Sequence, residues 1–181
     1  MTQAVIVIDM VKDFVTGKLK TERGAGLVPK VKRLLDAARR SGRPVIYVND
    51  AHLPVDGEVS IWGEHAMIGS EGAEVIDELK PQEKDYVLGK RTYSAFYETG
   101  LDPLLREINA DTVVLAGLHT NICARHTAAD AFFRGYKIVV PEDGVEAFTE
   151  KDHREGLEYL KKIYGAKLTK TEKLVKQWLK D

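Results

Sequence analysis

The chain has 181 residues, of which 44% are hydrophobic and 30% are charged, and its formal net charge is −1. This balance predicts a globular protein with a sizeable core, and the lack of excess positive charge argues against a nucleic-acid partner. The single cysteine excludes an internal disulfide framework and favours a reducing, cytoplasmic compartment. The N-terminus has no basic leader and no apolar run is long enough to span a bilayer, so we expect neither a signal peptide nor a membrane partner.

Six short apolar segments predict buried strands, and helical patterns separate most of them. The predicted strands are residues 4–8, 45–48, 86–88, 113–116, 137–140 and 166–168. The predicted helices are residues 29–41, 73–79, 101–108, 122–133, 150–164 and 171–180. Strands that alternate with helices predict right-handed βαβ units and a parallel sheet covered on both faces, which is an α/β fold. Because no linker or repeat interrupts the pattern, residues 1–181 are predicted to form a single domain.

Local signals refine the helices of this pattern. Pro29 is suited to the first turn of its helix, so residues 16–26 before it are predicted to be a loop. Thr149 is suited to the N-cap of the helix at 150–164, and Gly165 to its C-terminal stop. The helix at 122–133 has a predicted apolar side made of Ala128, Ala129, Ala131, Phe132 and Phe133.

Four residues with reactive or charged side chains lie at or just after the carboxyl ends of predicted strands: Asp9, Asp50, Lys90 and Cys123. Open parallel sheets bind ligands at this edge. Taken singly, Asp9 could cap a turn, Lys90 could be solvated and Cys123 could be a core residue. Together with Asp50 they bring a nucleophile, carboxylates and a cation to one edge, which is what cysteine-based acyl chemistry requires. Cys123 also falls in the first turn of a helix, where the helix dipole favours the thiolate.

A second group of polar side chains lies at the end of the second strand and in the long segment after it. This ligand group comprises Asp50, His52, Glu58 and His65. Carboxylates and imidazoles are suitable ligands for Zn²⁺, Mn²⁺ or Fe²⁺. Residues 53–72 lack clear periodicity, and a loop of this length in a compact domain is usually functional. From spacing alone, however, a solvated polar loop is the better interpretation.

Three segments, VIVIDMVKDF, VLGKRTYSAF and LAGLHTNICARHTAADAFFRGY, resemble in sequence and order the motifs of the isochorismatase-like cysteine hydrolases. This family includes nicotinamidases, N-carbamoylsarcosine amidohydrolases and ureidoacrylate amidohydrolases, and the resemblance spans almost the whole chain. It implies a three-layer α/β/α fold with a six-stranded parallel sheet of order 3-2-1-4-5-6. It also implies a homo-oligomer, either a dimer or a tetramer.

The resemblance implies that Asp9, Lys90 and Cys123 form a catalytic triad. It further implies a cis peptide bond between Leu118 and His119, which aims the backbone N–H groups of His119 and Cys123 at one point to form an oxyanion hole. In this mechanism Asp9 takes the thiol proton, Lys90 stabilises the thiolate, and the thiolate attacks an amide to give a thioester that water hydrolyses. Members that act on isochorismate commonly have another residue at the cysteine position. The thiol therefore favours hydrolysis of a small amide to a carboxylic acid and ammonia.

The resemblance also changes the interpretation of the ligand group. Nicotinamidases bind a metal with an Asp-x-His pair, a later histidine and, in some members, a glutamate seven residues before that histidine. All four residues of the ligand group match, which implies a divalent metal, Zn²⁺ or else Mn²⁺ or Fe²⁺, that anchors the pyridine nitrogen of the substrate. Phe14 and Trp62 match residues that pack on the substrate ring, although either could be ordinary core, and Tyr93 is a third predicted substrate-binding residue.

Some features depart from the nicotinamidase pattern. The KRTYSAF segment is compact where nicotinamidases often carry an insertion, and HLPVDGE and IWGEHA also resemble ureidoacrylate-type members. The side chain of His119 is unexpected in its turn, where it could contact the substrate or cap the turn. Three hypotheses follow: a metal-assisted nicotinamidase, an amidohydrolase for a carbamoyl or ureido compound, and a non-catalytic member of the fold. The intact triad argues against the third.

Overall fold

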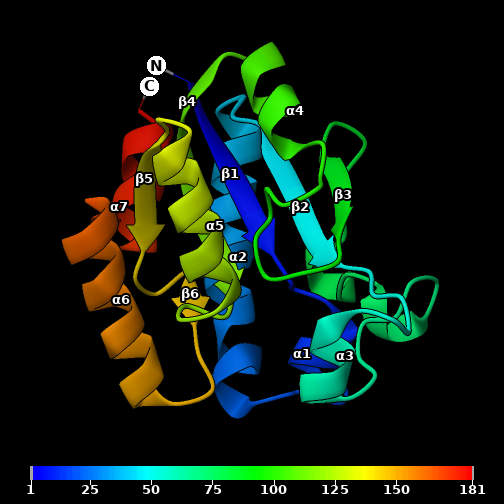
Figure 1. Ribbon diagram of the computed structural model, residues 1–181. Helices are drawn as coiled ribbons and strands as arrows, with labels where there is room; N and C mark the ends of the chain where they lie inside the picture. The colour runs from blue at the N-terminus through cyan, green and yellow to red at the C-terminus, as the bar shows by residue number, and fades with distance from the viewer. Residues whose placement is uncertain (1, 181) are drawn as a thin grey trace.

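The computed structural model describes residues 2–180, which form one parallel sheet covered by helices on both faces (Figure 1). Its strands are β1 (Thr2–Ile8), β2 (Val45–Asp50), β3 (Tyr86–Lys90), β4 (Ala110–Leu118), β5 (Lys137–Pro141), β6 (Val145–Glu146) and β7 (Lys167–Thr169). The sheet order is β3-β2-β1-β4-β5-β7, with β6 paired to β4. The six predicted strands and their order are confirmed, and the two-residue β6 is an addition. Met1 and Asp181, which the predicted domain includes, lie outside the described residues.

Seven α-helices lie within the described part of the chain. They are α1 (Lys12–Val15), α2 (Glu22–Arg40), α3 (Gly57–Trp62), α4 (Leu101–Glu107), α5 (Cys123–Phe133), α6 (Glu150–Tyr164) and α7 (Thr171–Trp178). Helices α2 and α7 pack together on one face of the sheet, whereas α4, α5 and α6 lie over the other face (Figure 1). None of the helices within residues 2–180 is long and apolar enough to cross a membrane.

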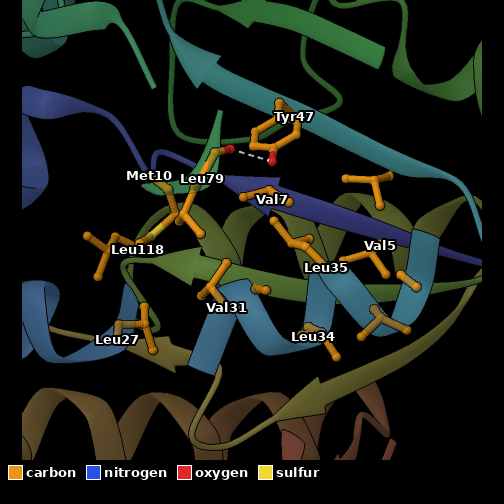
Figure 2. Packing of buried hydrophobic residues seen from close by; sticks show 14 of the residues in the cluster. Val5, Val7, Met10, Leu27, Val31, Leu34, Leu35, Tyr47, Leu79 and Leu118 are labelled. Atoms are coloured by element: carbon orange, nitrogen blue, oxygen red, sulfur yellow. Dashed lines mark hydrogen bonds between the residues drawn. The ribbon is translucent and has the colours of Figure 1, made fainter. Parts of the chain in front are cut away.

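The strand β1 is buried on both faces, as its continuous apolar sequence predicts. Because successive side chains of a strand point to opposite faces, Val5 and Val7 pack under α2 while Ile6 contributes to the core on the α4–α5 side. Figure 2 shows the first of these layers, with Leu35 of α2 against the strand. The Tyr47 hydroxyl in this layer donates a hydrogen bond to the Leu79 carbonyl at 2.7 Å, so its polar end is satisfied.

Helix α2 begins earlier than the sequence predicts. Residues 22–26 belong to its first turns, so the loop predicted at 16–26 is wrong for this part, and Pro29 lies inside the helix instead of opening it. The Thr21 Oγ1 atom accepts a hydrogen bond from the N–H of Gly24 at 2.9 Å, which is an N-cap. A Cβ on Gly24 would lie 3.2 Å from Thr21 Oγ1 and 3.4 Å from Leu118 Cδ1, so this glycine permits close packing.

Two other predicted elements also differ. The predicted helix at 73–79 is replaced by two single-turn 3₁₀ helices, η1 (Glu71–Ala73) and η2 (Asp77–Leu79), because Val75 between them pairs with Val11 in an antiparallel bridge. The segment predicted as a loop at 53–72 contains the helix α3.

The apolar side predicted for α5 is only partly buried. Ala128 and Ala131 are in the core, but the exposed fractions of Phe132 and Phe133 are 50% and 72%. The predicted caps of α6 are confirmed: Thr149 accepts a hydrogen bond from the N–H of Asp152, and Gly165 adopts the left-handed conformation at the C-terminal end.

The sheet register places the chemically important residues at one edge. Asp50 lies beside Lys90, while Ile8, which precedes Asp9, lies beside Gly117 of β4. The carboxyl ends of β1, β2 and β3 point toward the region of α1 and α3 in Figure 1. Gly117 has a φ of +113°, and a Cβ there would lie 2.0 Å from the carbonyl oxygen of Ile8, so only glycine lets β4 approach β1 this closely.

Candidate active site

Lys90 is buried between two carboxylates at the carboxyl edge of the sheet. Its Nζ atom lies 2.9 Å from Oδ2 of Asp9 and 2.5 Å from Oδ1 of Asp50, and only 1% of the residue is exposed. The other oxygen of Asp9 accepts a hydrogen bond from the backbone N–H of Asp50 at 2.8 Å. Strand pairing thus fixes all three side chains, because β1, β2 and β3 are adjacent in the sheet.

Cys123 is the first residue of α5, and its side chain faces this charge cluster. Its Sγ atom lies 3.7 Å from Nζ of Lys90, and the residue is 4% exposed. The structure therefore brings together the three residues that the sequence predicted as a triad: Asp9, Lys90 and Cys123. They come from the residue after β1, the end of β3 and the start of α5, and more than 30 residues separate each from the next along the chain.

The buried position sets the protonation of these groups. Burial raises the pKa of the Cys123 thiol well above its ordinary value, although Lys90 opposes this shift. Burial and the neighbouring Asp50 raise the pKa of Asp9 to about 6. Burial lowers the pKa of Lys90, but the two carboxylates outweigh it and hold the pKa well above the ordinary value. Burial therefore opposes the thiolate that the helix position favours, and the thiol faces a carboxylate able to accept its proton.

The turn that precedes Cys123 has the geometry implied by the resemblance. The peptide bond between Leu118 and His119 is cis. The turn is held by the N–H of Thr120, which donates to the Glu146 carbonyl at 2.8 Å, and by the carbonyl of His119, which accepts from Ala124 at 3.1 Å. Within residues 2–180, neither the N–H of His119 nor that of Cys123 donates a hydrogen bond, so both donors are available to a ligand.

The four residues of the ligand group also meet. One potential ligand atom from each of Asp50, His52, Glu58 and His65 lies within 4.8 Å of all the others, and all four residues are buried. Three of these residues have a buried side-chain atom without a hydrogen-bond partner in the described chain, namely Asp50 Oδ2, His52 Nε2 and Glu58 Oε1. Burial and the charge of Asp50 raise the pKa of Glu58 to about 7. Such a concentration of unpartnered ligand atoms suits a cation, so the residues present fit a divalent metal.

Neighbouring groups orient both histidines. The Nδ1 atom of His52 lies 3.3 Å from Oδ2 of Asp56, and Nδ1 of His65 lies 2.7 Å from the carbonyl oxygen of Gly63. These contacts assign the proton to Nδ1 and leave Nε2 as the free ligand atom in each ring, an arrangement typical of metal-binding histidines. Sequence reasoning gave Asp56 no role. Its position four residues after His52 was the available signal.

A cavity with several aromatic side chains in its wall adjoins both groups of residues. Its walls include the three predicted substrate-binding residues Phe14, Trp62 and Tyr93, together with His119 and Phe148. The Trp62 ring stacks on Phe148 with centroids 5.7 Å apart, and its Nε1 donates a hydrogen bond to the Tyr93 hydroxyl at 3.1 Å. Phe148 was missed in the sequence because it follows the two-residue strand β6 in a segment without periodicity. No lysine or arginine is among the residues that line this cavity.

Similarity to known proteins identifies the family of this chain. Residues 3–173 match the family model described as Isochorismatase domain. The chain belongs to the isochorismatase family. N-carbamoylsarcosine amidase from Thermoplasma acidophilum, whose structure is solved, is 46% identical in sequence to this chain. The TM-score is 0.91, and the match covers 95% of this chain and 98% of that one.

Two further solved structures of the family are similar over nearly their whole length. Nicotinamidase from Bacillus subtilis is 31% identical with a TM-score of 0.88, and the match covers 94% of this chain and 100% of that one. Pyrazinamidase of Pyrococcus horikoshii, solved in complex with zinc, is 26% identical with a TM-score of 0.87, and the match covers 94% and 99%. The predicted isochorismatase-like fold is thus confirmed. The protein is an isochorismatase-family hydrolase whose relatives include hydrolases of small amides.

Proposed function

We propose that this protein is a cysteine-dependent amidohydrolase of the nicotinamidase type. The observation that carries the proposal is the contact of Lys90 with both Asp9 and Cys123, of which Cys123 lines the cavity. It hydrolyses a small amide to a carboxylic acid and ammonia through a thioester.

The first half of the reaction forms the thioester. Asp9 accepts the thiol proton, and the ammonium of Lys90 stabilises the thiolate as it attacks the carbonyl carbon. The backbone N–H groups of His119 and Cys123 bind the oxyanion, and each such donor contributes about 3–4 kcal/mol in comparable sites. Asp9 then gives its proton to the leaving nitrogen, which departs as ammonia when the C–N bond breaks.

The second half hydrolyses the thioester. Asp9, ionised again, takes a proton from a water molecule that attacks the thioester carbonyl. The C–S bond breaks, the acid is released, and the proton returns from Asp9 to the sulfur of Cys123. The sum is an amide and water converted to an acid and ammonia, with the thiol, carboxylate and ammonium restored.

The residues that would hold a metal are those of the ligand group. Their geometry fits Zn²⁺, with Mn²⁺ and Fe²⁺ as alternatives, and a relative with zinc supports this assignment. When bound, the metal supplies a Lewis acid that binds a ring nitrogen and so fixes the ring of the substrate. Phe14 and Trp62 would pack on that ring, and Tyr93 holds Trp62 in place.

The cavity favours an uncharged, flat substrate. Aromatic side chains form much of its wall, and Lys90, which contacts the lining residue Cys123, is already paired with two carboxylates. A substrate that carries its own carboxylate would therefore lack a free partner among the lining residues, whereas a neutral pyridine carboxamide needs none.

A second candidate is an amidohydrolase for a carbamoyl or ureido compound. The observation in its favour is the 46% identity to an N-carbamoylsarcosine amidase, which exceeds the identity to the nicotinamidase. The chemistry at Cys123 would be the same, and only the group that occupies the aromatic cavity would differ.

Ammonia release from a panel of amides tests both candidates. The panel contains nicotinamide, benzamide, N-carbamoylsarcosine and ureidoacrylate, each incubated with metal-loaded wild-type protein and with Cys123→Ala. We expect nicotinamide to be hydrolysed fastest and benzamide, which lacks the ring nitrogen, much more slowly. Preference for a carbamoyl or ureido compound would replace the first candidate by the second. No ammonia from any amide would contradict both and leave a non-catalytic member of the fold.

A further inference from the structure

The imidazole of His119 is buried in the cavity wall without a hydrogen-bond partner. The residue is 2% exposed, and within residues 2–180 neither Nδ1 nor Nε2 has a partner. Buried polar groups in native proteins are nearly always hydrogen-bonded, because an unpaired one costs free energy. Since this ring lines the same cavity as Cys123, a ligand in the cavity can supply the missing bond.

The ring is held in place without either nitrogen. It stacks on Phe148 with centroids 4.0 Å apart, and the edge of Phe14 contacts it with a centroid distance of 5.7 Å. The backbone of the turn is fixed separately by the hydrogen bonds of Thr120 and Ala124. Capping the turn, the alternative role considered from the sequence, is therefore not what the imidazole nitrogens do.

The environment also defines the kind of group that this ring can recognise. Burial lowers the pKa of His119 to about 4, so the imidazole is neutral near pH 7 and offers one N–H donor and one nitrogen acceptor. A neutral ring brings no positive charge to balance a substrate carboxylate, and the carboxylates of Asp50 and Glu58, which line the same cavity, would repel one. An uncharged ring nitrogen, amino group or hydroxyl is the suitable partner.

We propose that His119 is a specificity-determining residue whose imidazole hydrogen-bonds an uncharged polar group of the substrate outside the reacting carboxamide. The inference rests on the proposed amidohydrolase function, because Cys123 fixes where the carboxamide lies. One residue would then serve twice: its backbone N–H binds the oxyanion, and its side chain selects amides with a second polar group a few bonds away. The metal, by contrast, would bind the pyridine nitrogen.

The test measures the ratio of kcat/KM for a substituted nicotinamide to kcat/KM for nicotinamide, and compares this ratio between metal-loaded wild-type and variant enzymes. The substrates are benzamide, nicotinamide, pyrazinamide, and nicotinamides with a single amino or hydroxyl group at each open ring carbon. In the wild type, at least one of the probes with the added polar group should exceed nicotinamide by about tenfold, the factor that one neutral hydrogen bond can supply. His119→Phe should reduce this ratio to about one, and His119→Asn, which keeps a donor and an acceptor, should restore part of it.

Thermal unfolding of the free protein supplies a readout that a structural role would move in the opposite direction. His119→Phe keeps the stacked ring and removes two unpartnered nitrogens, so its Tm should rise. The matched variant Phe148→Leu removes the stack and keeps the nitrogens, so its Tm should fall.

Two results for His119→Phe would overturn the inference and leave the proposed function intact. One is an unchanged substrate ratio, and the other is a lower Tm together with an equal loss of kcat/KM for every amide. If the wild type hydrolyses no aromatic amide, the proposed function fails and the inference fails with it.

Discussion

Two adjacent clusters of buried charge differ in how completely they neutralise themselves. Lys90 is in direct contact with Asp9 and faces Cys123, so the proposed catalytic cluster contains its own cation. The ligand group contains two carboxylates and two imidazoles, and three of its residues have an atom without a partner in the described chain. The first cluster has its cation within the polypeptide, whereas the second has the composition of a site that takes its cation from solution.

The largest expected effect is the loss of the nucleophile. Cys123→Ala and Cys123→Ser should each lower kcat for amide hydrolysis by at least about 10⁴-fold, because no other side chain can form the thioester. Metal content and the far-UV circular dichroism spectrum should remain those of the wild type, since the ligand group does not include Cys123. Turnover retained by either variant would exclude the covalent mechanism.

The second prediction breaks the charge balance of the catalytic cluster. Asp9→Asn and Lys90→Ala should each lower kcat/KM by about 10²–10⁴-fold, and the double variant should cost little more because the residues act as a unit. Lys90→Ala should also lower the free energy of unfolding by about 3–5 kcal/mol, because it leaves two buried carboxylates without a cation.

Steady-state kinetics and denaturant unfolding measure both effects. Clearly additive losses in the double variant would place one of the two residues outside the site. Increased thiol reactivity in Lys90→Ala would contradict its role in stabilising the thiolate.

The third prediction concerns the cation of the ligand group. Purified protein should contain about one divalent transition metal per chain, and His52→Ala or His65→Ala should lower this content. Chelation should raise KM for nicotinamide by about 10–100-fold and should change thiol reactivity much less, because the metal holds the ring and not the nucleophile. Benzamide serves as the control substrate, since it has no ring nitrogen to lose. Metal-free protein with an unaltered KM would contradict the metal site and leave these four residues as a buried polar cluster.

The smallest expected effect is the pH dependence of stability that Glu58 of the ligand group causes in the metal-free protein. In the metal-free protein the folded carboxyl of Glu58 keeps its proton up to about pH 7, whereas the unfolded one releases it near pH 4.5. Stability should therefore fall as pH rises through this window, because the folded state binds more protons than the unfolded state. Glu58→Gln should remove this dependence and stabilise the chelated protein by about 1–2 kcal/mol at pH 8.

Chemical unfolding of the chelated proteins as a function of pH measures this effect. Glu64→Gln, which removes an exposed carboxylate from the same segment, is the matched control and should leave the pH dependence unchanged. A destabilised Glu58→Gln would mean that the carboxylate already has a partner in the metal-free protein.

The elements predicted best from the sequence are those buried on both faces. Strands such as β1 and β4 are continuous apolar runs, and the parallel order follows from the alternation with helices. The start of α2 was missed because Gly24 is ordinarily a signal for a loop and Pro29 was assigned to the first helical turn. A Cβ on Gly24 would lie 3.4 Å from Cδ1 of Leu118, so close packing explains the glycine. Phe132 illustrates the reverse error, since an apolar residue at the right spacing need not face the core.

The candidate site was predictable to the extent that its residues lie at strand ends or in motifs. Asp9, Lys90 and Cys123 were placed on one edge by the parallel topology alone. The ligand group required the family resemblance, because its spacing does not distinguish a metal site from a polar loop. Phe148 could not have been predicted, because its role arises from stacking on His119 and Trp62, which are distant in sequence.

The position of Asp50 links the two clusters through a single carboxylate. Its Oδ1 atom contacts Lys90, while its Oδ2 atom belongs to the ligand group. A cation bound at Oδ2 withdraws negative charge from Lys90, which then interacts more strongly with a thiolate at Cys123. By thermodynamic reciprocity, ionisation of the thiol must strengthen cation binding by the same factor. Asp50 would thus couple the binding of the metal, which holds the substrate, to the ionisation of the Cys123 thiol.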